Sequence, residues 1–84
     1  MKRYRAPIEV ECDPAGRPVG FGWRGRAYRV GSVQGCWVED TGWWTGGGRV
    51  VLWRLEATAG GGLDGVFELV SRDDDGWLLD RQWD

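Results

Sequence analysis

The sequence predicts an all-β protein, a small antiparallel barrel or strongly bent sheet of SH3-like type with about six or seven short strands. Apolar residues alternate with polar residues at a period of two along most of the chain. Fifteen glycines and three prolines divide the chain into short runs. No segment combines helical spacing of apolar residues with capping residues, so no long helix is expected. The 84 residues are expected to form a single all-β domain, residues 1–84.

The first expected strand covers residues 8–12, where three apolar side chains alternate with two glutamates. Residues 13–16 (Asp-Pro-Ala-Gly) have the composition of a turn. The second strand covers residues 19–23, and Gly20 and Gly22 fall on its outer face. Glycines at such positions predict a second backbone close by, or a strong bend.

A tight hairpin turn is expected at Arg24-Gly25, because a two-residue connection requires positive φ and glycine adopts it without a Cβ clash. The third strand then contains Tyr28 and Val30, and a weaker fourth strand covers residues 33–39. Residues 40–48 are expected to form a loop.

The clearest strand covers residues 49–57. The apolar residues Val51, Trp53 and Leu55 share one face there, with charged residues on the other. A glycine-rich turn at 59–62 leads to a sixth strand at 66–70.

The turn at 73–76 leads to a last strand, which is expected to place Trp77, Leu79 and Trp83 on one face. Of the seven tryptophans, Trp23, Trp53 and Trp77 are therefore expected in the core.

Cys12 and Cys36 are predicted to be buried, reduced thiols, because each lies in an apolar strand setting. A disulfide between them is the alternative if their strands are adjacent. Two thiols without any histidine do not provide the four ligands of a structural zinc site, so no metal is expected.

An enzyme is not expected. The chain has no histidine, so the usual general base near neutral pH and every Ser-His-Asp or Cys-His arrangement are missing. The glycine triplets at 46–48 and 60–62 lack the flanking strand, helix and Lys-Ser or Lys-Thr of a phosphate loop. Asp73-Asp74-Asp75 has the composition of a solvated turn. We expect no catalytic residues and no cofactor.

Tryptophan and arginine together indicate binding. Trp43 and Trp44 are adjacent, so a regular strand points them to opposite faces and one core cannot take both. The candidate binding residues are these two with Arg49, and Arg24 and Arg26 beside Trp23. Such a set suits a protein–protein interface or single-stranded nucleic acid stacked on aromatic rings. The third interpretation is that Trp43 and Trp44 cover an open barrel end.

The charge distribution bears on the choice of partner. The net charge is −2, which argues against strong non-specific DNA binding. Seven of the 11 cationic residues precede Val30, and the last dozen residues are acidic. This asymmetry either creates a basic face or neutralises itself when the two ends meet in the fold.

Several segments resemble an uncharacterised bacterial domain family. They are Pro18-Val19-Gly20-Phe21-Gly22-Trp23-Arg24-Gly25-Arg26-Ala27-Tyr28-Arg29-Val30, Gly42-Trp43-Trp44, the strand from Val50 to Glu56, Gly65-Val66-Phe67-Glu68-Leu69, and Trp77-Leu78 with Trp83-Asp84. The resemblance covers nearly the whole chain. It implies a free-standing small protein, or one associated with Y-family DNA polymerase-like proteins, and so a link to DNA repair. It brings no established activity and no site residues, and the two cysteines and the glycines after Trp44 depart from the pattern.

The sequence thus predicts a non-catalytic accessory or protein-interaction module, linked to DNA repair by the resemblance. The alternative is a small β-barrel that binds single-stranded nucleic acid. The longest apolar run, residues 50–53, is too short to span a membrane, and no targeting peptide is recognisable. We expect a cytoplasmic protein with a protein partner, or nucleic acid, and no membrane contact. The sequence gives no indication of the oligomeric state.

Overall fold

The computed structural model describes residues 2–40, 49–60, 62–72 and 76–83. These residues form seven antiparallel strands, so the prediction of an all-β fold is confirmed. The strands are β1 (Lys2–Ile8), β2 (Val10–Cys12), β3 (Pro18–Trp23), β4 (Arg26–Asp40), β5 (Arg49–Ala59), β6 (Leu63–Arg72) and β7 (Gly76–Trp83).

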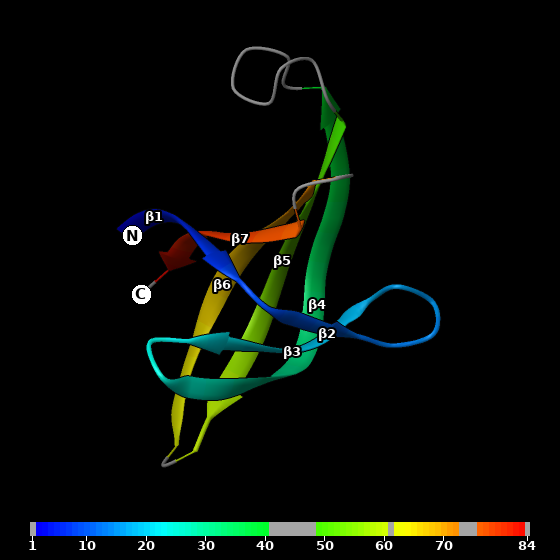
Figure 1. Ribbon diagram of the computed structural model, residues 1–84. Helices are drawn as coiled ribbons and strands as arrows, with labels where there is room; N and C mark the ends of the chain where they lie inside the picture. Colours follow the sequence, from blue (N-terminus) through cyan, green and yellow to red (C-terminus); the bar gives the residue numbers. More distant parts are fainter. Residues whose placement is uncertain (1, 41–48, 61, 73–75, 84) are drawn as a thin grey trace.

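The strands make one sheet in the order β1-β7-β6-β5-β4-β3-β2, curled into a half-barrel (Figure 1). Its first and last members, β1 and β2, are consecutive in the chain and separated by Glu9 alone. The segment from Lys2 to Cys12 therefore pairs with β7 through β1 and with β3 through β2. The curl follows from this connection, because one bent segment serves both edges of the sheet.

The main core lies inside the curl. Its buried members are Phe21, Leu55, Ala57, Phe67, Leu69 and Leu79. A second, smaller cluster of buried residues, Val50, Val70 and Leu78, lies on the outer face. Aromatic rings dominate the contacts: Phe21 stacks on Tyr28 with centroids 5.1 Å apart, and Phe67 meets both rings edge-on. Trp23, Trp53 and Trp77 are half-buried and pack against this core, as predicted. The expected faces of β5 are confirmed, since Trp53 and Leu55 belong to the core.

The turn between β3 and β4 is the predicted one. Arg24 has φ of 51° and Gly25 has φ of 75°, the pair of positive values that a two-residue hairpin turn requires. The glycines of β3 also behave as expected. A Cβ on Gly20 would lie 3.2 Å from the carbonyl oxygen of Tyr28 on the neighbouring strand.

Two strand predictions were wrong. The expected third and fourth strands are one strand, β4, because two register shifts between Val30 and Gly35 bend it without breaking its pairing to β5. Strand β1 was not predicted, because its charged residues hide the alternation. Its partner β7 lies at the other end of the chain, beyond the reach of any local pattern.

The prediction that Trp83 shares a face with Trp77 and Leu79 was wrong. The register between β6 and β7 shifts between Glu68 and Leu69, opposite Asp80. A shift of one residue moves the rest of a strand to the other face. Trp77 therefore packs on the core, while Trp83 lies on the outer face of the sheet beside Glu68.

Candidate binding edge of strand β4

Strand β4 has two neighbours in its first part and one in the rest. Residues Arg26–Arg29 pair with β3 on one side. From Val30 to Asp40, every strand partner in the described part of the chain belongs to β5. β4 and β5 run on together away from β3 (Figure 1). One side of β4 thus presents backbone N–H and C=O groups without a strand partner among the described residues, as the edge of a sheet does. We call Val30–Glu39 the open edge.

The side chains of the open edge are exposed on both faces of the sheet. Val33 is 37% exposed, Trp37 39% and Val38 56%. The ladder gives their directions: Val33 and Cys36 lie opposite the core residues Leu55 and Trp53, while Trp37 lies opposite Leu52 on the outer face. Apolar side chains therefore flank the edge on either face.

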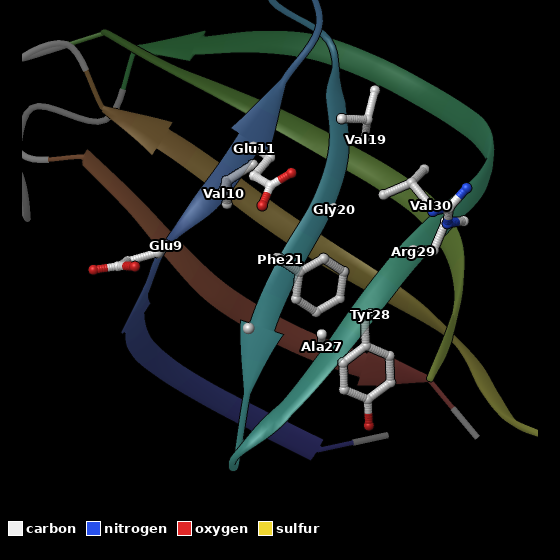
Figure 2. Close-up of a pocket in the computed structure, with 11 residues that line it drawn as sticks. Glu9, Val10, Glu11, Val19, Gly20, Phe21, Ala27, Tyr28, Arg29 and Val30 are labelled. Atoms are coloured by element: carbon white, nitrogen blue, oxygen red, sulfur yellow. The ribbon is translucent and has the colours of Figure 1, made fainter. Parts of the chain in front are cut away.

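A pocket of ≈ 800 Å³ lies where β3 and β4 part. Figure 2 shows the two strands diverging, with Val19 on one arm and Val30 on the other. Val19 is 42% exposed. Glu11, Gly20 and Arg29 lie in one cross-strand row, so the missing side chain of Gly20 leaves bare backbone between a carboxylate and a guanidinium. We call this pocket the fork. The open edge begins at it.

A second hollow of ≈ 390 Å³ lies on the outer face beside Trp37. Glu68 is only 5% exposed and accepts a hydrogen bond from Trp83 Nε1 at 2.9 Å. Arg54 lies over the Trp83 ring, its guanidinium carbon 4.6 Å from the centroid. Arg54 and Arg81 are the direct cross-strand neighbours of Glu68. The Glu68 carboxylate thus lies between Arg54 and Arg81 on the neighbouring strands. The Trp83 indole contacts both the Glu68 carboxylate and the Arg54 guanidinium.

The structure brings two of the five predicted binding residues to one end of the sheet. Arg24 lies over the Tyr4 and Trp23 rings, 5.0 and 5.2 Å from their centroids. Arg26 is exposed and pairs with Trp23. Arg24 lies in the tight turn and Arg26 begins β4 directly after it, so both are set apart from the open edge.

The other three predicted residues are not tested. Trp43 and Trp44 lie outside the described residues. Arg49 begins β5 opposite Asp40, and its side chain is not described. The proposed use of Trp43 and Trp44 stays a prediction.

The prediction that both thiols are buried was wrong. Cys12 and Cys36 are free and exposed. Cys36 faces the core side of the sheet, yet it lies beyond the point where β3 leaves β4, so among the described residues β4 has no strand neighbour other than β5 there. Cys12 ends the short strand β2. Partial burial, and then the neighbouring charge of Asp13, raise the pKa of the Cys12 thiol above its ordinary value.

Sequence reasoning did not single out Trp37 and Val38. Their alternation was recognised as a weak strand, and the absence of Lys, Arg and Pro from Gly35–Glu39 was the available signal. What makes the segment a candidate site is the departure of β3, which depends on pairing between distant parts of the chain.

The described residues contain neither a metal-binding group of side chains nor a membrane-spanning helix. In the described ranges, no three or more Cys, Asp or Glu side chains are grouped so as to hold a metal ion. No helix among the described residues has the length and apolar character needed to cross a membrane.

Comparison with known proteins gives a family and no relative of known function. Searches of curated proteins and of solved structures found no match to the chain. One family model matches residues 1–84, the whole chain. The chain therefore belongs to the family described as "Domain of unknown function (DUF6504)".

Proposed function

We propose that this chain is a non-catalytic protein-interaction module that takes an extended segment of a partner along the open edge of β4. The observation that carries the proposal is the one-sided pairing of Val30–Asp40 in the described structure. An added strand gains main-chain hydrogen bonds from such an edge, and pockets for alternate side chains give it specificity. The exposed side chains of Trp37 and Val38, on opposite faces, supply those contacts.

The composition of the edge supports the same use. Natural proteins block open edges with Lys, Pro, bulges or covering segments, because an unprotected edge promotes aggregation. β4 has two register shifts before Gly35, but Gly35–Glu39 pairs regularly and carries no Lys, Arg or Pro. An apolar edge left open in this way costs solubility, and binding a partner strand compensates for that cost.

The test is a display library of random linear peptides, panned against the chain. Enriched peptides should lose affinity at least about tenfold for Val38→Lys, because a charge replaces an exposed apolar contact at the edge. The matched control is Ala15→Lys, an exposed position in the turn between β2 and β3. Hydrogen exchange should show added protection at amides of Val30–Glu39.

Peptides that bind Val38→Lys as well as the parent chain, or protect a different surface, overturn the proposal. Failure to enrich any peptide from the library also counts against an edge that accepts strands.

The link to DNA repair is the finer part of the proposal. It comes from the resemblance to a family associated with Y-family DNA polymerase-like proteins, and the partner strand is then expected in that machinery, in the cytoplasm. The direct test uses a purified Y-family DNA polymerase-like protein as the partner. Its binding should be lost with Val38→Lys and kept with Ala15→Lys.

Single-stranded nucleic acid is the alternative partner, and the observation behind it is the cation beside the rings of Tyr4 and Trp23. These two rings contact each other edge-on with centroids 4.9 Å apart, and Arg24 lies over both. Arg24 therefore places a positive charge beside two aromatic rings, the combination that binds single-stranded nucleic acid. Titration of oligonucleotides at low and high salt decides: binding that Arg24→Gln weakens and Val38→Lys leaves unchanged favours this alternative.

A further inference from the structure

We propose that the strand that fills the open edge is the same edge of a second copy, paired antiparallel about a two-fold axis at Trp37. This inference rests on the proposed function and names its partner. Its grounds are the faces to which the side chains of the edge point, the apolar row that ends at Trp37, and the position of the charge on Glu39.

The register shifts of β4 decide which side chains of the open edge share a face. The core side carries Val30, Val33, Cys36 and Val38, and the outer side carries Ser32, Gly35, Trp37 and Glu39. After the second shift the sides alternate strictly, so Gly35–Glu39 is the part of the edge that forms a regular ladder. A two-fold axis perpendicular to the sheet makes the two edges antiparallel and keeps the core sides together. Directly opposed residues therefore have to share a face.

An axis at Trp37, the middle of this regular segment, satisfies the condition and uses the segment in full. The pairs are Trp37–Trp37 and Gly35–Glu39 on the outer side, and Cys36–Val38 on the core side. An axis at Cys36 sets Val38 against Gln34, at the register shift. An axis at Val38 sets Glu39 against the indole of Trp37 and leaves Gly35 without a partner in β4.

The outer side favours this axis because an apolar row ends there. Trp37, Leu52, Val70 and Leu78 are cross-strand neighbours on β4, β5, β6 and β7. Val70 and Leu78 are buried, whereas Trp37 at the end of the row is 39% exposed. The second copy continues the row with its own Trp37, and aromatic pairs across antiparallel strands are stabilising. Each indole leans over its own Gly35, where an added Cβ would lie 3.0 Å from the ring, so the two rings lean in opposite directions.

The charge on the regular segment also fits an antiparallel copy. Its charged residue is Glu39, which is exposed. A parallel copy in register would oppose the two glutamates, which is destabilising. The axis at Trp37 offsets them by four positions, about 13 Å. Each Glu39 then lies at the end of the other copy's row of Gly35, Arg54, Glu68 and Arg81, and the charges along that row alternate in sign.

The pair of Cys36 with Val38 tests the register, because both side chains are exposed and open to substitution. Val38→Lys and Cys36→Glu should each weaken dimerisation at least about tenfold in sedimentation equilibrium under reducing conditions. An equimolar mixture of the two variant chains should associate again, because the introduced lysine of one chain then faces the introduced glutamate of the other. Damage to the fold would not be repaired by mixing.

Control mixtures make this test specific. Val38→Lys with Cys36→Lys should stay monomeric, because like charges are opposed. Val38→Lys with Val38→Glu should associate more weakly than Val38→Lys with Cys36→Glu, because the two Val38 positions are only diagonal neighbours in this register. Stronger association of the Val38 mixture would place the axis at Val38 and overturn the register. Ala15→Lys should leave the dimer of the parent chain unchanged.

The outcomes separate the two proposals. A chain that stays monomeric at all concentrations, but binds panned peptides at β4, overturns the second copy and keeps the proposed function. A monomer that binds no peptide overturns both. A dimer that is unaffected by Val38→Lys and Cys36→Glu has its interface elsewhere, and one that both variants disrupt without recovery on mixing has another register. Either result overturns the inference.

Discussion

Glu68 shows how single side chains stabilise the outer face of this sheet. Burying a carboxylate is costly unless hydrogen bonds and neighbouring cations compensate. Here Trp83 Nε1 donates to it, and Arg54 and Arg81 flank it across the strands. Asp80 at the register shift adds ion pairs, with its oxygens 3.4 Å from Arg81 Nε and 3.9 Å from Arg5 Nε. The outer face therefore combines this polar cluster with the buried apolar residues Val50, Val70 and Leu78.

At the same scale, the two thiols give a prediction about pH. Both are exposed, so the native protein should react with a thiol reagent without unfolding. The thiolate is the reactive form, and the raised pKa of Cys12 lowers its thiolate fraction at a given pH. In a Cys36→Ser variant, the labelling rate should therefore rise with pH over a higher range in the native than in the denatured protein.

Asp13→Asn tests the second cause of that pKa shift, the nearby negative charge, and leaves the larger cause, partial burial, in place. The Asp13 side chain accepts hydrogen bonds from the Ala15 and Arg17 amides, and an Asn oxygen replaces it there while the charge is removed. The rate profile of Cys12 should move toward lower pH. Identical profiles in the native and denatured protein would contradict the assignment.

At the scale of elements, the β3–β4 hairpin depends on the backbone of its turn. Gly25→Val should lower the free energy of unfolding by about 1–3 kcal/mol, because a β-branched residue is strained at a φ of 75°. No atom lies within 4 Å of the added Cβ, so the effect is conformational and not steric. Gly25→Asn is the control, since Asn tolerates positive φ. Equal stability of both variants in urea titrations would count against the strained turn.

Prediction from sequence succeeded where structure is local. The Arg24-Gly25 turn and the two faces of β5 follow from residues close together in the chain. It failed where pairing is non-local: the shift opposite Asp80 moved Trp83 to the outer face, and the departure of β3 exposed Cys36. The open edge of β4 was not predicted for the same reason. Of the candidate binding residues, Arg24 lies over the ring of Tyr4. Tyr4 belongs to β1, a strand that was not predicted.

At the scale of the whole molecule, β1 pairs with β7 and also contacts β3 through its Tyr4 side chain. Tyr4 contacts Trp23, and its hydroxyl lies 3.5 Å from Gln82 Oε1. Tyr4→Ala should lower the free energy of unfolding by about 2–3 kcal/mol, through lost burial and ring contacts. Arg3→Gln, an exposed neighbour, should change it by less than about 0.5 kcal/mol. Tryptophan fluorescence during denaturation measures both, and an unaltered Tyr4→Ala protein would mean that β1 is not part of the cooperative unit.

The pairing of β1 with β7 also decides when the fold is complete during synthesis. Lys2 pairs with Gln82, so β1 leaves the ribosome before its partner β7 is made and has to wait for it. Closing so long a loop costs entropy before any contact compensates, which slows folding. Until then the core lacks the contacts that Tyr4 and Ile8 of β1 make with it in the folded protein. This interval, and not the native state, is when a chaperone is most needed.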